Sequence, residues 1–211
     1  RCGVDALEVA MMQRDAAVPD LVAFNHYPHS ERYLFSLGKN GGEDVADVPA
    51  VYVAGEPPPA AGPLLRAAAE RLRLPLALGE VHVNAPAPER VRWLASHAAD
   101  VQQLRAGGVD VRALGAWAAF GMVDWHSLLR ERARVVEDGI YTFAGPNGTP
   151  QPTAVAAALR ELADTGRIDD GGVRGWWERA GRALPLDELL AMRDAGTPEG
   201  DHLRTVDEAL T

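Results

Sequence analysis

The hydrophobic pattern of the chain contains three short, mostly apolar runs that are typical of buried strands. They cover residues 21–27, 74–80 and 109–117. Runs of this kind, without strict alternation of polar residues, are expected where a sheet is covered on both faces. The three runs therefore predict a parallel sheet inside a layered fold.

Apolar residues at helical spacing separate and follow these runs. The spacing predicts helices over 62–73, 88–108 and 153–163, with Thr153 as the N-cap of the last one. A shorter amphipathic pattern over 4–14 predicts a helix at the beginning. Because strands and helices alternate, we expect the α/β class of fold, which places the carboxyl ends of its parallel strands at one edge.

Polar and aromatic residues follow each predicted strand at its carboxyl end, where sites of parallel α/β folds are built. In chain order these candidate site residues are Asn25, His26, Tyr27, Glu80, His82, Trp117, Asp124 and Trp125. The sequence therefore predicts that three polar clusters converge on one rim and that Glu80 points into a pocket there.

Composition limits the possible functions. The 211 residues suit one domain or one domain with a tail, and a net charge of −9 without a Lys/Arg block argues against a nucleic-acid partner. The apolar runs are too short for a membrane span. With Cys2 as the only cysteine, no internal disulfide can form, and we expect a cytoplasmic location.

The periodic pattern weakens after Gly166, although Trp176 and Trp177 indicate some further packing. We therefore predict one unit over 1–165 and a C-terminal extension over 166–211. Because the first residue is Arg1, without a signal segment after it, we also expect that the sequence is a piece of a longer protein.

Glu80 and Tyr27 are the strongest candidates for chemistry. A carboxylate at a strand end can act as a nucleophile or a general base, and a tyrosine hydroxyl can orient it and keep it ionised. Structural roles would also account for these two residues: Glu80 could cap a helix or form a salt bridge, and Tyr27 could pack against a loop. Trp117, Asp124 and Trp125 could clamp a sugar, or pack in the core.

Histidines supply a further set of polar groups near the same rim. His26 and His82 could donate to ligand hydroxyls or serve as structural hydrogen-bonding groups. Together with His29 they could also bind a metal, but their spacing matches no common metal motif, and we expect no metal.

The residues at the three strand ends resemble family 1 glycoside hydrolases. Trp117 followed by Asp124-Trp125 is similar to the eighth-strand Trp and acid-Trp pair that hold the sugar, with Asp where Glu is usual. Asn25 and Tyr27 resemble the sixth-strand Asn-Tyr-Tyr. Glu80 matches the nucleophile of the seventh-strand Thr-Glu-Asn-Gly motif, although Gly79 and Val81-His82 replace its neighbours.

These departures resemble a divergent bacterial subgroup in which such a barrel is fused to a dTDP-4-dehydrorhamnose reductase-like domain. The shared features are the His-Tyr to Ser-Glu-Arg run over 26–32, the Glu-Val-His strand, the Asp-Trp-x-Ser-Leu turn over 124–128 and the Gly-Trp-Trp segment over 175–177. The resemblance implies a fused reductase-like domain in the full-length protein.

The resemblance implies the last three strands, about six to eight, of a (β/α)8 barrel, and retaining hydrolysis of a carbohydrate without a cofactor. Glu80 would be the nucleophile, oriented by Tyr27, and the remaining candidates would contact the sugar. The family's acid/base lies in an Asn-Glu-Pro motif, which is absent here, and Glu56-Pro57 lies in a loop. We therefore expect the acid/base in an N-terminal half, and no hydrolysis by this chain alone.

Three other interpretations stay open. The module could bind a sugar or sugar nucleotide without turnover, because the motif around Glu80 is altered. It could be an interaction scaffold, because a short parallel sheet leaves unpaired edges. It could also be a metal-dependent hydrolase on the same barrel, with the three histidines as ligands.

Overall fold

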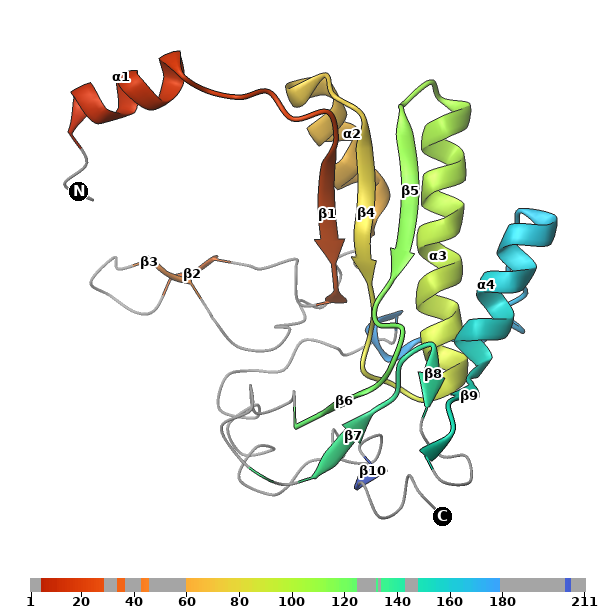
Figure 1. Ribbon diagram of the computed structural model, residues 1–211. Helices are drawn as coiled ribbons and strands as arrows, with labels where there is room; N and C mark the ends of the chain where they lie inside the picture. Colours follow the sequence, from red (N-terminus) through yellow and green to blue (C-terminus); the bar gives the residue numbers. More distant parts are fainter. Residues whose placement is uncertain are drawn as a thin grey trace.

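The body of the protein is a three-stranded parallel sheet with the strand order β1–β4–β5 (Figure 1). The computed structural model describes residues 5–28, 34–36, 43–45, 60–124, 132, 134–142, 148–178 and 204–205. The strands are β1 Val22–His26, β4 Leu76–Val81 and β5 Val111–Ala116. The predicted strands and their parallel order are confirmed.

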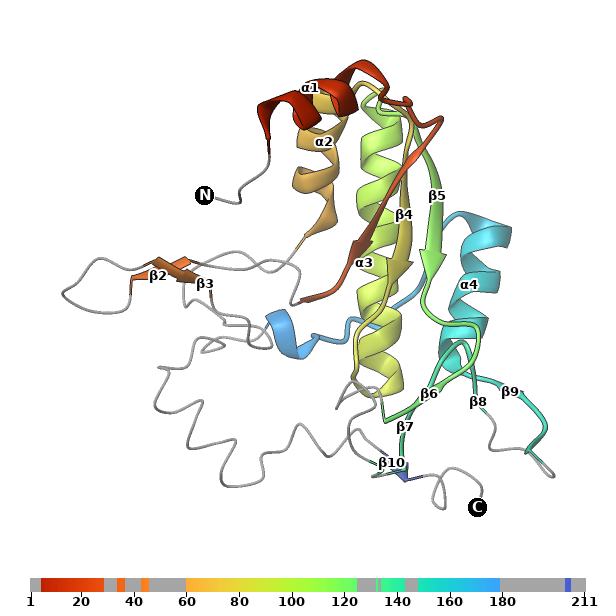
Figure 2. The same cartoon turned by 60° about the vertical axis from the view of Figure 1, so that its left-hand side comes forward.

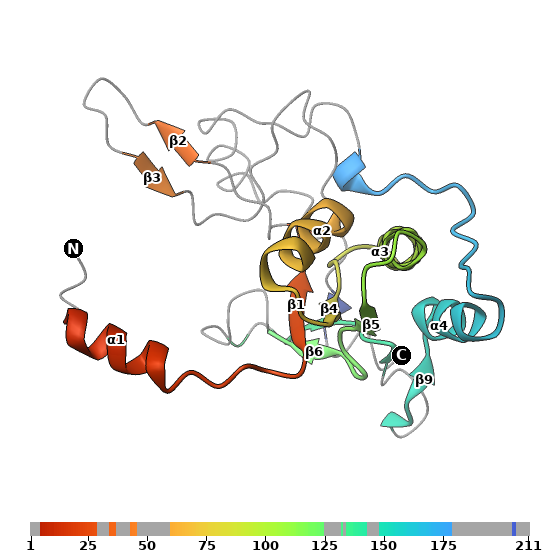
Figure 3. The same cartoon turned by 90° about the horizontal axis from the view of Figure 1, so that it is seen from above.

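The predicted helices are also present. Their bounds are α1 Ala6–Arg14, α2 Ala61–Leu72, α3 Ala87–Ala106 and α4 Ala154–Thr165. Viewed from above, α2 and α3 lie on one side of the sheet and α4 lies beyond β5 (Figure 3). Within the described ranges, no helix is long and apolar enough to cross a membrane.

The first helix differs from its prediction. Asp5 caps α1 by accepting a hydrogen bond from the Leu7 amide at 2.9 Å, but α1 buries none of its residues. Its apolar side chains, Met12 for example with 72% exposure, therefore do not pack on the sheet. Figure 1 shows α1 apart from the sheet.

Shorter elements surround the carboxyl end of the sheet and extend from it. They are β2 Leu34–Ser36, β3 Glu43–Val45, β6 Met122–Val123, β7 Val135–Glu137, β8 Tyr141–Thr142, β9 Gln151–Pro152, η4 Trp176–Glu178 and β10 Arg204–Thr205. Figure 2 shows β6 to β9 below the strand ends. β2 and β3 pair with each other in an antiparallel ladder.

The expectation that both faces of the sheet are covered holds for the central strand, where Leu76, Ala77 and Leu78 are all buried, but not for the edge strands within the described residues. Ala23 and Asn25 on β1 are exposed, as are Arg112 and Ala113 on β5, whereas Leu76 on β4 is fully buried against the helices. α2 and α3 lie on one side of the sheet, and the opposite, open face has no described helix on it (Figure 3). The open face has small or polar side chains at these positions.

A β-bulge in β4 determines which face receives Glu80. Phe24 is opposite Leu78, but the next residue, Asn25, is opposite Glu80, so Gly79 is an extra residue in β4. Leu78 and Val81, which lie three residues apart, are both buried in the core. In a strand without a bulge, Glu80 would share the face of Leu78. The bulge instead directs Glu80 to the open face.

Gly115 of β5 makes room for this bulge. A Cβ atom at position 115 would lie 2.5 Å from the carbonyl oxygen of Gly79, which is closer than a van der Waals contact allows. The glycine is therefore required because the bulged backbone of β4 approaches β5 here, and this close approach fixes the geometry of the strand just before Glu80.

The core lies between the sheet and α3, whose buried residues recur at helical spacing. Trp93 is 1% exposed and contacts the edge of Trp177 with the ring centroids 4.9 Å apart. Asp100 of α3 accepts a hydrogen bond from the amide of Gly62 at 2.8 Å and thereby caps α2. Trp177 packs in the core, as predicted from the sequence.

Two histidines lie beside Trp93 in this core. His26 stacks on Trp93 with the rings 5.5 Å apart, and its Nδ1 lies 2.7 Å from Nε2 of His97. His97 Nδ1 lies 2.7 Å from the Trp93 carbonyl oxygen, so it donates there, and Nε2 accepts from His26. Burial, and secondly the nearby His26, lower the pKa of His97 to about 3.

We predict that Gly115→Ala destabilises the protein by about 1–3 kcal/mol, because the added methyl group overpacks the bulge. Chemical denaturation measures the change in the free energy of unfolding. Gly107→Ala is the control, since a Cβ atom there would meet its nearest neighbours at 3.4 Å, an ordinary contact. Equal stabilities for the two variants would contradict the proposed role of Gly115.

We predict that the free energy of unfolding falls as the pH decreases from about 6.5, the ordinary pKa of histidine, towards the lowered pKa of His97. Between these values the unfolded chain binds a proton that folded His97 does not. Denaturation of the wild type and His97→Gln across this range provides the test. The pH dependence should be weaker in the variant; parallel curves would contradict the prediction.

Candidate site at the carboxyl end of the sheet

Tyr27 and Glu80 meet at the carboxyl ends of β1 and β4. The Tyr27 hydroxyl donates a hydrogen bond to Oε2 of Glu80. Within the described residues, Oε1 of Glu80 has no hydrogen-bond partner. Burial, followed by the hydrogen bond with Glu80, raises the pKa of Tyr27. The hydroxyl therefore stays protonated and keeps one carboxylate oxygen in place.

Asn25 lies next to this pair on the exposed face of β1, opposite Glu80. Its side-chain Oδ1 lies close to Gly79, where a Cβ atom would come within 3.2 Å of it. A larger residue at position 79 would therefore crowd Asn25. The structure brings Asn25, Tyr27 and Glu80 together as the sequence predicted.

His26 is not on the same face as these residues. Strand alternation turns its side chain towards α3, where it is 3% exposed and contacts Trp93 and His97. A contact between His26 and a ligand hydroxyl, one of the sequence-based options, does not fit this position. The structural alternative, a histidine that hydrogen-bonds within the core, is what the geometry shows.

His82 lies two residues after Glu80 and pairs with a residue that the sequence analysis missed. Its Nε2 contacts Oε1 of Glu137 at the end of β7, and the side chains are 11% and 14% exposed. Glu80 and His82 are half-buried, while Val81 and Val83 between and after them are buried. This alternation places Glu80 and His82 on the same side of the strand.

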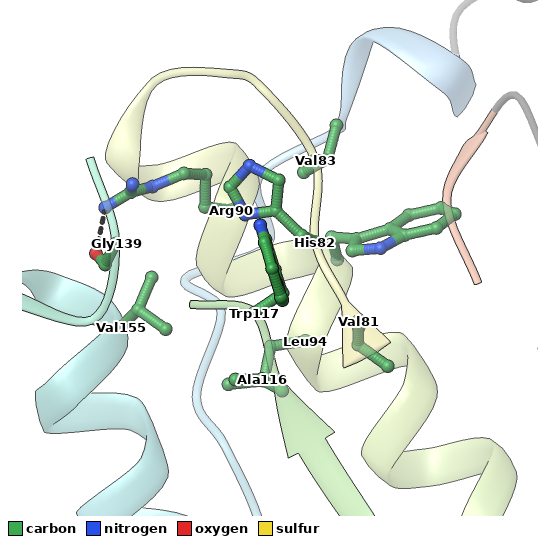
Figure 4. A pocket seen from close by; sticks show the side chains of 10 residues that line it. Val81, His82, Val83, Arg90, Leu94, Ala116, Trp117, Gly139 and Val155 are labelled. Carbon is green, nitrogen blue, oxygen red and sulfur yellow. Dashed lines mark hydrogen bonds between the residues drawn. The ribbon is translucent and has the colours of Figure 1, made fainter. Parts of the chain in front are cut away.

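A cavity of about 10 Å³ lies next to His82 and is lined also by Trp117 and Arg90 (Figure 4). Its size suits about one water molecule and excludes a sugar. Arg90 donates from Nη1 to the carbonyl of Asp138 and from Nη2 to that of Gly139, the latter at 3.4 Å. The cavity therefore borders the site without being its ligand pocket.

Trp117 and Asp124 follow β5, and the third member of their cluster, Trp125, lies outside the described residues. The backbone amide of Trp117 donates to the carbonyl of Val81 at 3.1 Å, and the Trp117–Ala118 peptide bond is cis. Asp124 is 8% exposed and has a positive φ of 59°. Trp117 thus lies beside the end of β4, whereas Asp124 is largely buried.

The predicted cap of α4 is only partly confirmed. Thr153 occupies the N-cap position but makes no side-chain cap. Its hydroxyl instead donates to the carbonyl oxygens of Ile140 at 2.8 Å and Gly139 at 3.1 Å. Thr153 therefore ties the start of α4 to the segment that follows β7, just beyond Glu137.

Glu137 could have been found in the sequence. It follows the apolar pair Val135-Val136 in the same way that Glu80 follows an apolar strand. The segment was too short to stand out as a strand, because β7 has three residues.

Within the described ranges, no group of three or more His, Cys, Asp or Glu side chains is arranged to hold a metal ion.

Comparisons with known proteins place this sheet in a structural context. No protein-family model matches the chain, and no curated protein matches it. Solved structures do match. The β-glycosidase from Thermosphaera aggregans is 17% identical, with a TM-score of 0.52 over 72% of this chain and 33% of that structure.

Two further structures give similar values. The β-glucosidase from Pyrococcus furiosus is 19% identical, with a TM-score of 0.54 over 77% of this chain and 36% of its own. The β-glucosidase from Thermotoga maritima in complex with deoxynojirimycin is 11% identical. The match has a TM-score of 0.55 and covers 79% of this chain and 39% of that structure.

The chain thus spans between 33% and 39% of the length of these three structures. They are (β/α)8 barrels of family 1 β-glycosidases. At these identities the similarity establishes the fold alone: the α/β body described above is similar to part of a (β/α)8 barrel.

Proposed function

We propose that the chain belongs to a retaining glycoside hydrolase of the family 1 type and contributes its nucleophile, Glu80. The observation that carries this proposal is the hydrogen bond from Tyr27 to one oxygen of Glu80, with the other oxygen unpartnered among the described residues. A nucleophilic carboxylate needs such an arrangement, because one oxygen is oriented while the other attacks.

In this proposal residues 1–165 form the C-terminal strands, about six to eight, of the barrel, and 166–211 form an extension. The packing of Trp177 against Trp93 attaches at least the first part of that extension to the body. The similarity to about a third of each solved barrel supports the chain's being part of a barrel, and the assignment to strands six to eight rests on the sequence resemblance. A fused reductase-like domain remains a proposal from the sequence resemblance.

The reaction would begin with attack of Glu80 Oε1 on the anomeric carbon while a second carboxyl group protonates the leaving oxygen. We place that acid/base outside this chain. Water then hydrolyses the ester at Glu80 and releases the sugar. Tyr27 orients Glu80, and Asn25, Trp117, Asp124 and Trp125 are the proposed sugar contacts. The proposed reaction needs no cofactor.

We predict that a 2-deoxy-2-fluoro glycoside with a good leaving group labels Glu80 covalently in the protein that includes the natural coding sequence around this chain. Intact mass followed by peptide mass spectrometry locates the label. Glu80→Gln should abolish the label and lower kcat by about 10³-fold or more, roughly 4 kcal/mol in the barrier.

Glu70→Gln is the matched control for this experiment, because Glu70 is exposed on α2, away from the strand ends. It should keep the label and the activity. Wild-type hydrolysis by the Glu80→Gln protein would refute the proposed nucleophile.

A second candidate function is sugar binding without turnover. It is favoured by the altered surroundings of Glu80, where Gly79 approaches Asn25 and His82 pairs with Glu137. Binding of deoxynojirimycin, measured by calorimetry on the same protein, would support this function if neither label nor hydrolysis is detected.

A further inference from the structure

A second carboxylate lies at the same edge of the sheet as Glu80. Glu137 ends β7, and its Oε1 contacts Nε2 of His82. Its side chain is 14% exposed and that of His82 is 11% exposed. Within the described residues, Oε2 of Glu137 and Nδ1 of His82 have no hydrogen-bond partner. The pair is therefore largely enclosed, and each side chain has one polar atom without a hydrogen-bond partner among these residues.

The backbone around Glu137 is held from several directions. Arg90 of α3 donates to the carbonyl oxygens of Asp138 and Gly139. The amide of Ile140 donates at 2.8 Å to Ala118, which follows β5. β7 also pairs with β6 in an antiparallel ladder. Glu137 thus sits on a strand end that is fixed to both the helix layer and the extension of the sheet.

The position of Glu137 relative to Tyr27 connects the two pairs. The negative charges of Glu80 and Glu137 both contribute to the raised pKa of Tyr27, after burial and the hydrogen bond from Tyr27 to Glu80. Glu80 and His82 lie on the same side of the strand after the bulge. Tyr27, Glu80, His82 and Glu137 therefore share one rim.

We propose that Glu137 is a positioning residue of the site built on Tyr27 and Glu80, where it fixes His82 beside the nucleophile. The two unpartnered atoms, Glu137 Oε2 and His82 Nδ1, then face the hydroxyl groups of a polyhydroxylated ligand. The ligand class rests on the proposed function, but the position of Glu137 does not.

The test is nuclear magnetic resonance at a fixed, neutral pH on the full chain labelled with 13C-tyrosine and 15N-histidine. The chain contains four tyrosines and six histidines, and His82→Gln identifies the His82 signals. Tyr27→Phe identifies the Tyr27 signal. In Glu137→Gln, the 13Cζ resonance of Tyr27 should shift from its wild-type position, because a nearby negative charge is removed. The ring nitrogen resonances of His82 should shift at the same time, because its carboxylate partner is lost.

Asp110→Asn is the control, since Asp110 is an exposed acid paired with Arg112 at the opposite end of β5. It should leave both signals in place. Unchanged Tyr27 and His82 signals in folded Glu137→Gln protein would overturn the inference. If that variant does not fold, the wild type decides: nuclear Overhauser contacts between the Glu137 side chain and the His82 ring support the proposal, and their absence overturns it.

The effect of Glu137→Gln on the Tyr27 and His82 signals does not depend on whether the proposed function is correct. If Glu80→Gln protein still hydrolyses glycosides while Glu137→Gln shifts both signals, the nucleophile assignment fails and the position of Glu137 stands. If Glu80 is labelled and Glu137→Gln shifts neither signal, the hydrolase proposal stands and this inference fails.

Discussion

The site depends on one backbone irregularity, the bulge at Gly79. Strict alternation from Leu76 and Leu78 would send the side chain of Glu80 into the layer of helices, where an ionised carboxylate would lose its hydration. The extra residue shifts the alternation so that Val81 enters the core and Glu80 reaches the open face. The close approach of Gly115 then holds the bulged backbone in place.

The hydrogen-bonded pair of Tyr27 and Glu80 follows from this constraint. β1 has no extra residue, so Asn25 and Tyr27 alternate with His26 and reach the face to which the bulge directs Glu80. His26, in contrast, takes part in the core with Trp93 and His97. Adjacent residues of one strand thus serve the candidate site and the core, and the sequence motif Asn-His-Tyr combines both roles.

Sequence patterns predicted the strands and helices better than they predicted which face of the sheet each side chain reaches. The apolar runs and helical spacings gave the three strands and the helices, because burial controls both patterns. The convergence of Tyr27 on Glu80 was predictable because parallel strands end at a common edge. The inward direction of His26, the bulge at Gly79 and the partner of His82 were not, because they depend on register and on a contact between residues 55 positions apart.

The contacts at the start of α3 determine which parts of the protein unfold together in local unfolding. Within its first two turns, Glu89 accepts from the amide of Trp176, Arg90 donates to the segment after β7, and Arg92 pairs with Asp170 and Glu178. Two segments that are remote in sequence, 138–139 and 170–178, are thus fastened to one helix end. In native-state hydrogen exchange they should open together with that end as a single cooperative unit, so the site edge gains its order from α3 and not from the sheet alone.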